Sequence, residues 1–181
     1  MAGRLKETAL AAGYRVRAAR EADLARLPAL ERAAAHLFTD AGLEGDYLAE
    51  TLPLEALREG LEAGFLFVAE AGDGTPVGFA LARPLDGELY LVELDVHPDH
   101  GRRGLGRALV EAVLARARTA GYPSVSLVTF RDLPWNAPFY ERLGFRPLAR
   151  DAVGPALRAV LEDEARRGLP SERRTAMRAR A

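Results

Sequence analysis

The sequence predicts an α/β fold built on a mixed sheet. One observation is the succession of strand, helix and strand over residues 88–130, because such a crossover normally makes the two strands parallel. The other two are the glycine turns at 72–74 and 86–87, which separate apolar runs and predict antiparallel hairpins. Parallel and antiparallel pairs in one chain make a mixed sheet.

The first half of the chain is expected to alternate short strands with amphipathic helices. Acidic residues at Glu21 and Asp23 suit a helix start, and leucines at helical spacing then continue to Phe38. The expected order is a polar lead-in at 1–13 whose composition allows a helical turn, a strand at 14–18, a helix at 23–38, a loop at 39–46, a helix at 47–63 broken near Pro53, and strands at 65–70, 77–83 and 88–97.

The second half opens with the clearest helix, whose apolar stripe begins at Leu105 and which ends at Gly121 and Pro123. Asn136 can cap a short helix that tolerates Pro138 in its first turn. The expected order is a helix at 105–120, a strand at 124–130, a short helix at 136–143, a strand at 145–150, an extra helix at 155–168 and a strand at 173–180.

Composition bounds the class of protein. A chain of 181 residues with 49% hydrophobic and 28% charged residues suits a single domain, here 1–181. A net charge of −1 argues against a nucleic-acid partner. There is no cysteine, the three histidines are scattered, and no metal site is expected. No apolar run could span a membrane and no signal peptide opens the chain, so we expect a cytoplasmic protein without a membrane partner.

The stretch 89–109 carries the strongest functional signal, because a buried strand, a glycine-rich loop and a helix start follow one another. The first amides of a helix lack partners within the helix, and the helix dipole adds positive charge there. Glycines let the backbone approach an anion closely. The loop holds Gly101, Gly104 and Gly106, and its flanking charges are Arg102, Arg103 and Arg107. The stretch therefore predicts a diphosphate site.

The spacing separates this loop from two common phosphate-binding motifs. It reads Gly101-x-x-Gly104-x-Gly106 instead of G-x-G-x-x-G, and no acidic residue about 20 positions later ends a second strand. A P-loop is excluded because no Gly-Lys-Ser/Thr follows and Lys6 is the only lysine. An unrelated nucleotide-binding α/β protein stays open as an alternative.

Two carboxylates precede the loop on the strand 88–97. Strict alternation would put Tyr90, Val92, Leu94 and Val96 on one face, and would put Glu93 and Asp95 on the other. Ligands bind at this end of strands in open α/β sheets, where a carboxylate can take a proton from an ammonium or attract it. Alternatively, the carboxylates lie on a solvated face or hold structural arginines, and a bulge would upset the facing.

Two motifs resemble the GNAT superfamily of N-acetyltransferases. Val96-His97-Pro98 and Arg103 to Leu109 match its acetyl-coenzyme A loop, although Gly101 stands where the family has Arg or Gln. The segment 135–145 matches the second motif, in which Tyr140, Gly144 and Phe145 align and Asn136 is closer to the tyrosine than usual. The two matches lie at the separation usual for the family.

The resemblance implies a partly splayed sheet with helices on both faces, and transfer of an acetyl group from acetyl-coenzyme A to a primary amine of a small molecule or peptide. It implies that Tyr140 protonates the leaving thiolate, and Glu93 is the candidate base; packing of Tyr140 beside Phe139 and Phe145 is the structural alternative. The expected cofactor-binding residues are Leu94, Val96, Gly101, Arg102, Arg103, Gly104, Leu105, Gly106, Arg107, Asn136 and Tyr140.

The helix at 155–168 lies where family members commonly have a short connection. It is expected to overhang the acceptor side of the cleft and to shape acceptor choice, or alternatively to cover a homodimer surface. A catalytically silent acyl-coenzyme A sensor or partner-binding protein is the alternative to an enzyme.

Overall fold

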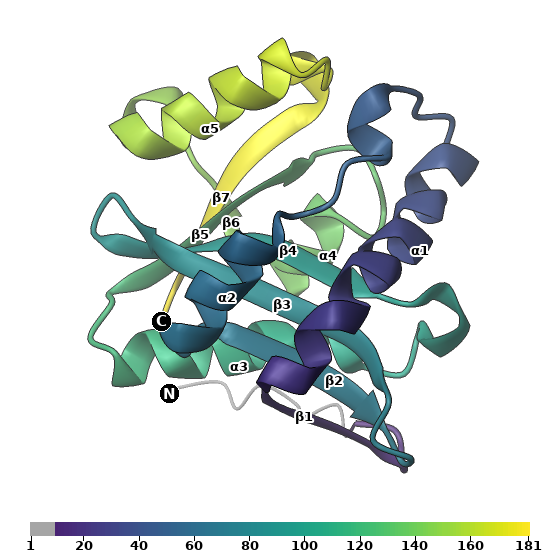
Figure 1. Cartoon of the computed structure of the whole chain (residues 1–181). Coiled ribbons are helices and arrows are strands. Elements are labelled where there is room, and N and C mark those ends of the chain that lie inside the picture. The colour runs from purple at the N-terminus through teal and green to yellow at the C-terminus, as the bar shows by residue number, and fades with distance from the viewer. Residues whose placement is uncertain (1–9) are drawn as a thin grey trace.

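The computed structural model describes residues 10–181, and the first nine residues of the expected lead-in lie outside it. Its strands form one seven-stranded sheet in the order β1-β2-β3-β4-β5-β7-β6. The strands are β1 (Tyr14–Ala18), β2 (Leu66–Ala71), β3 (Pro76–Leu85), β4 (Glu88–Val96), β5 (Ser124–Phe130), β6 (Arg146–Pro147) and β7 (Arg174–Arg180). Figure 1 shows the sheet with its helices.

The sheet is mixed because β4 and β5 run parallel while the other neighbours are antiparallel. The parallel pair is short: only Leu89 with Val125 and Tyr90 with Ser126 are in register. Beyond Tyr90 the two strands separate toward the end of β4. The prediction of a mixed, partly splayed α/β sheet is confirmed.

Helices cover both faces of the sheet, as expected. The α-helices are α1 (Leu27–Asp40), α2 (Leu54–Glu62), α3 (Leu105–Thr119), α4 (Ala137–Arg142) and α5 (Pro155–Arg166). The stripe of α3 that includes Leu105, Leu109 and Val113 is fully buried against one face. Each such side chain stabilises the fold by roughly 1.5–3 kcal/mol. On the opposite face α1 and α2 cover β2, β3 and β4, and α5 lies above β7 at the top of Figure 1.

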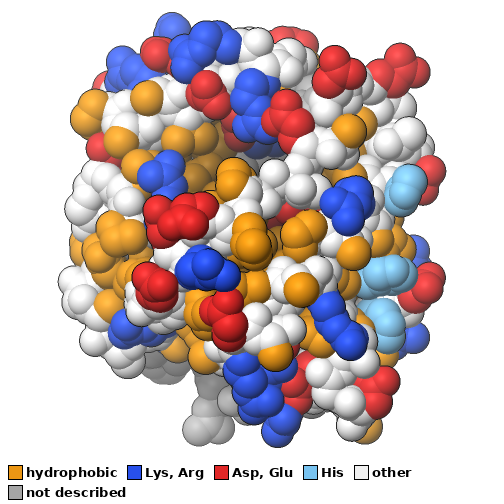
Figure 2. Space-filling view, in the orientation of Figure 1, with side chains coloured by type: hydrophobic (Ala, Val, Ile, Leu, Met, Phe, Trp, Pro, Cys, Tyr) orange, Lys and Arg blue, Asp and Glu red, His pale blue; other side chains and the backbone are white. Residues whose placement is uncertain are grey.

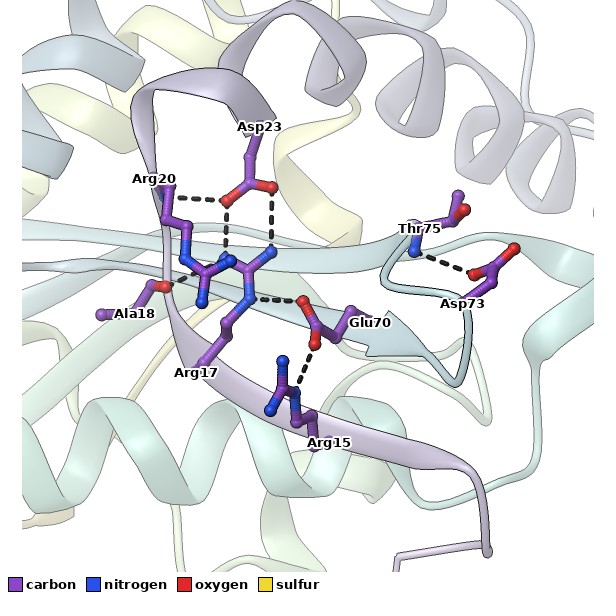
Figure 3. Close-up of polar contacts among 8 residues, drawn as sticks. All are labelled: Arg15, Arg17, Ala18, Arg20, Asp23, Glu70, Asp73 and Thr75. Atoms are coloured by element: carbon purple, nitrogen blue, oxygen red, sulfur yellow. Dashed lines mark hydrogen bonds and ion pairs between the residues drawn. The ribbon is translucent and has the colours of Figure 1, made fainter.

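A buried ionic network fixes the entry into α1 (Figure 3). Glu70 of β2 is 2% exposed and binds Arg15 and Arg17 of the neighbouring strand β1. The Arg17 guanidinium also donates two hydrogen bonds to Asp23, at 2.6 and 2.9 Å. Asp23 lies in the 3-10 helix η1 (Glu21–Arg26) and accepts the Arg20 amide. The edge of the sheet thereby sets where α1 begins.

The helix expected at 47–63 is interrupted as its proline suggested, but more widely. A single 3-10 turn, η2 (Asp46–Leu48), comes first, and α2 starts only after Pro53. The strand expected at 145–150 is shorter in the structure, because only β6 pairs with β7. The Leu148 amide still donates to the Ala176 carbonyl of β7, at 2.9 Å, and the chain then turns into η4 (Arg150–Ala152).

The extra helix is α5, and a turn residue from the other half of the chain caps it. Asp86, in the turn between β3 and β4, has φ 50° and accepts the amide hydrogens of Ala156 and Leu157 at 3.0 and 2.9 Å. A carboxylate at a helix N-terminus satisfies unpaired amides and opposes the positive end of the dipole. Across residues 10–181, none of the helices has the length and apolar character needed to cross a bilayer.

Candidate active site

The glycine-rich loop joins the open end of β4 to α3. After Val96 the chain makes the turn η3 (Pro98–His100) and then passes through two left-handed residues, Arg102 at φ 58° and Gly104 at φ 81°. The first helical hydrogen bond of α3 runs from the Ala108 amide to the Gly104 carbonyl, at 3.0 Å. The preceding amides of α3, at 105–107, therefore have no acceptor within the helix. This backbone suits an anion.

The arginines of the loop are used in different ways. Arg103 donates to the Asp99 carbonyl and lies over the ring of Tyr14, 5.8 Å from its centroid. Arg107 binds Glu111 at 2.7 Å on the same helix. Arg102 is exposed. The Arg103 side chain thus supports the loop, that of Arg107 pairs within α3, and the backbone amides are the clearest anion-binding groups.

The loop, the end of β4 and α4 meet at the first turn of α3. A Cβ atom on Gly106 would lie 3.5 Å from the ring of Phe139, an ordinary van der Waals distance, so α4 packs directly on this turn. Leu94 and Val96 pack against the same core as α3, and the buried Leu105 lies at the start of that helix. The sequence-predicted cofactor residues of the strand and loop are therefore neighbours in space.

A bulge in β4 changes which side chains face the cleft. Leu81 of β3 pairs with Glu93, whereas the next residue, Ala82, pairs with Leu91. Val92 is therefore the extra residue on β4. A bulge inserts one residue and reverses the facing of every side chain beyond it.

The prediction that Tyr90, Val92, Leu94 and Val96 share one face is wrong for this reason. Tyr90 and Val92 pack toward the side covered by α1, α2 and α5, whereas Leu94 and Val96 pack toward α3. The carboxylates beyond the bulge consequently lie on the side of Tyr90. The bulge thus points acidic groups away from α3 and into a separate cleft.

This cleft has a volume of about 1100 Å³ and runs between β4 and β5, under α1 and α5. In Figure 2 the same face of the molecule is hollowed, and hydrophobic side chains lie there among charged ones. Its lining includes Glu31 of α1, Glu93 and Asp95 of β4, Tyr140 of α4 and Glu164 of α5. Elements from both halves of the chain therefore contribute to one site.

The carboxylates of the cleft are held in conditions that favour their neutral forms. Burial, followed by the charge of Glu31, raises the pKa of Glu93 to about 7. Burial and the charge of Glu93 raise the pKa of Asp95, which is only 7% exposed. Burial also raises the pKa of Glu31. A group with a pKa near 7 can accept and return protons at neutral pH.

Tyr140 occupies the junction between the cleft and the core beside α3. Its ring contacts Phe139 and Phe145 edge to face, with centroids 5.0 and 5.6 Å apart. Burial, and then the charges of Glu93 and Asp95, raise the pKa of its hydroxyl above the usual 10.0. The hydroxyl therefore stays protonated and can donate a proton.

Asn136 lines the cleft but does not cap α4 through its side chain. Its side-chain oxygen accepts a hydrogen bond from the Thr129 hydroxyl of β5, and its backbone carbonyl accepts the amides of Phe139 and Tyr140. The residue thus ties α4 to the splayed strand β5. This contact holds Tyr140 in place.

Sequence reasoning missed Glu31. Its carboxylate accepts the Leu52 amide hydrogen with both oxygens, at 3.0 and 2.9 Å. The signal was present in the helix pattern, because Glu31, Ala35 and Phe38 recur at helical spacing and all line the cleft. These three residues lie on a different face of α1 from the buried Leu27 and Leu30.

The family assignment follows from comparison with known proteins. The Acetyltransferase (GNAT) family model matches residues 18–145, so the chain belongs to this family. The resemblance seen in the two motifs is confirmed.

Among curated relatives, a mycothiol acetyltransferase of Propionibacterium freudenreichii subsp. shermanii is 30% identical over 168 residues, which cover 89% of this chain and 52% of that protein. N-acetyltransferase family 8 member 2 of Rattus norvegicus is 35% identical over 104 residues, 54% of this chain and 45% of that protein. The chain spans about half the length of these two relatives.

Solved structures share the fold at low identity. The PaiA N-acetyltransferase from Thermoplasma acidophilum, in complex with coenzyme A, matches with a TM-score of 0.69 and 16% identity over 93% of this chain and 99% of that one. N-acetylglutamate synthase from Neisseria gonorrhoeae, complexed with coenzyme A and N-acetyl-glutamate, gives 0.67 and 17% over 92% of this chain and 35% of that one.

Proposed function

We propose that this protein transfers the acetyl group of acetyl-coenzyme A to a primary amine of a small molecule or peptide. The observation that supports it most is the position of the gap between β4 and β5. The glycine-rich loop lies at its end, and a cleft with acidic groups and a tyrosine lies along it. Membership in an acetyltransferase family agrees with this reading.

In this proposal the backbone of the loop binds the diphosphate of the co-substrate. The unpaired amides of the first turn of α3 and the left-handed turn at Gly104 provide the contacts. The extended arm of coenzyme A then lies in the gap beside Leu94 and Val96, where β4 pairs with β3 on one side and has no partner on the side of β5. Asn136 lies at the far side of the gap.

Glu93 and Tyr140 carry the proton transfers. Glu93 takes a proton from the acceptor ammonium, directly or through water, and the neutral amine attacks the thioester carbonyl carbon. The C–N bond forms, the C–S bond breaks, and the nitrogen loses its second proton. Tyr140 donates its proton to the departing sulfur and is reprotonated, so that one proton in total is released to solvent.

A binding measurement tests the co-substrate first. We expect acetyl-coenzyme A at 100 times its Kd to stabilise the protein by about 3 kcal/mol in a thermal-shift assay. Mononucleotides should have little effect. A response to mononucleotides without one to acetyl-coenzyme A would instead identify an unrelated nucleotide-binding protein.

The loop offers a matched pair of variants for the same assay. Gly104→Val and Gly121→Val place a side chain on residues with nearly equal φ, 81° and 82°, so both should lose on the order of 1–2 kcal/mol of stability. Only Gly104→Val should lose acetyl-coenzyme A affinity, because Gly121 ends α3 at its other terminus. Equal acetyl-coenzyme A affinity in both variants would show that the loop is only a structural turn and does not bind the co-substrate.

Turnover separates an enzyme from a sensor. Thiol release from acetyl-coenzyme A with a panel of amines should show catalysis, and binding without any turnover would identify a silent acyl-coenzyme A sensor.

We also propose that the protein acts in the cytoplasm, and that α5 either shapes acceptor choice or covers a homodimer surface. Size-exclusion chromatography with light scattering distinguishes the last two.

A further inference from the structure

Three carboxylates of the cleft have no cationic partner among residues 10–181. Glu31 comes from α1, and Glu93 and Asp95 come from β4, yet none of them forms an ion pair with an arginine of that range. One oxygen of Asp95, Oδ2, is buried without any hydrogen-bond partner. An unpaired buried carboxylate is costly, and such a group requires a specific reason.

The arginines that line the cleft are engaged elsewhere. Arg174 binds Glu164 with two hydrogen bonds of 2.7 and 2.8 Å, and Arg167 binds Glu50. Arg83 lies over the ring of Tyr90, 5.7 Å from its centroid. Among the described residues, Glu31, Glu93 and Asp95 are therefore left without a cationic partner in the cleft.

These carboxylates occupy two distinct positions. Glu93 and Asp95 belong to the strand that borders the gap, where the reacting amine would lie. Glu31 is on another element, and the Leu52 amide fixes both of its oxygens. Apolar side chains such as Ala35, Leu52 and Val92 line the cleft as well. A ligand that satisfies the whole site needs one cation at each position and an apolar connection between them.

We propose that the acceptor is an aliphatic amine with at least two positive charges, a diamine or polyamine. This inference rests on the proposed function and adds the substrate class. The amine to be acetylated lies beside Glu93 and Asp95, and the second ammonium binds Glu31. An amino-acid acceptor fits less well, because its carboxylate would add a further negative charge to a buried acidic site.

The test compares 1,4-diaminobutane and spermidine with n-butylamine and glycine, measured by thiol release at saturating acetyl-coenzyme A. We expect kcat/KM for the diamine to exceed that for n-butylamine at least tenfold. Because the second contact is between charges, the ratio should fall as salt concentration rises.

Glu31→Gln isolates the second position, since its amide oxygen can still accept the Leu52 hydrogen. The diamine-to-monoamine ratio of kcat/KM should fall about tenfold in this variant. Glu162→Gln removes a charge from an exposed residue of α5 outside the cleft and should leave the ratio unchanged. A ratio near one in the unaltered protein, or an unaffected ratio in Glu31→Gln, overturns the inference.

The two proposals fail in different ways. If acetyl-coenzyme A does not bind, the proposed function fails. If it binds but calorimetry detects no diamine or spermidine binding to the coenzyme A complex, and neither is acetylated, only the substrate class is wrong. Faster acetylation of glycine than of the diamine would likewise show that only the proposed substrate class is wrong.

Discussion

If Tyr140 is the proton donor, removal of its hydroxyl should abolish that role even when its ring is kept. The ring packs between Phe139 and Phe145, and Tyr140→Phe preserves that packing. We expect this variant to lower kcat about 10²–10⁴-fold and to change acetyl-coenzyme A affinity little. Single-turnover thiol release measures the chemical step directly and avoids a limit set by product release.

Tyr122 supplies the matched control. It packs edge to face on Phe65, with centroids 6.0 Å apart, away from the cleft. Tyr122→Phe makes the same chemical change and should keep the turnover of the unaltered protein. Equal turnover in both variants would assign Tyr140 to the core.

Glu93 should control the pH dependence of the reaction. Because its pKa is raised to about 7 and the base must be ionised, the rate should rise with pH through about 7. Burial is the main cause of this raised pKa; the charges of Glu31 and Glu164 raise it further, and the Leu94 amide and the charge of Arg174 lower it. Glu93→Gln should remove this rise, and an unchanged profile would exclude Glu93 as the base.

The same raised pKa predicts that the stability of the protein falls as pH rises, whereas the reaction rate increases. The folded state holds the Glu93 proton up to about pH 7, while the unfolded chain releases it near 4.5. Stability is therefore lost as pH rises between these values, and Glu93→Gln should be more stable than the unaltered protein above pH 7 by about 1–2 kcal/mol. Urea unfolding at pH 4.5 and 8 measures this, and a gain of equal size at both values would contradict it.

At the scale of elements, α5 is joined to the other side of the cleft by the pair of Arg167 and Glu50. This pair is partly exposed, so its loss should cost at most about 1 kcal/mol. We expect Arg167→Gln to raise the acceptor KM about two- to fivefold and to leave the acetyl-coenzyme A Kd unchanged. Arg166→Gln breaks only a pair within α5, with Asp163, and serves as the control. A change in acetyl-coenzyme A Kd would show that α5 does more than border the acceptor.

The start of α1 depends on the pair of Asp23 and Arg17. The hydrogen bonds from Arg17 lower the pKa of Asp23 below 3.8, so its contribution is present at neutral pH and is lost as pH falls through the folded-state pKa. Asp23→Asn should destabilise the protein at pH 7 by on the order of 2 kcal/mol, and this difference should shrink in acid. Glu44→Gln, at an exposed site, is the control for urea unfolding. A pH-independent loss would show that charge is not the cause.

For the molecule as a whole, local patterns predicted the fold better than they predicted the site. The crossover through α3 and the two glycine turns depend on neighbours in sequence, and the structure has them. Local patterns did not predict which face of the sheet each β4 side chain lies on, because the bulge at Val92 depends on how β3 pairs with β4. Glu31 and the Asp86 cap on α5 were missed because their partners, Leu52 and residues 156–157, are remote in sequence.

The narrow junction between β4 and β5 has a mechanical consequence. Two registered residue pairs connect a sheet of four strands to one of three, so under a pulling force this seam should part before either half unravels. A ligand lying along both strands, as we propose for acetyl-coenzyme A, would bear load across the seam. In optical-trap experiments with handles on β1 and β7, saturating acetyl-coenzyme A should therefore raise the first rupture force. The co-substrate would then act as a missing strand of the sheet as well as a reactant.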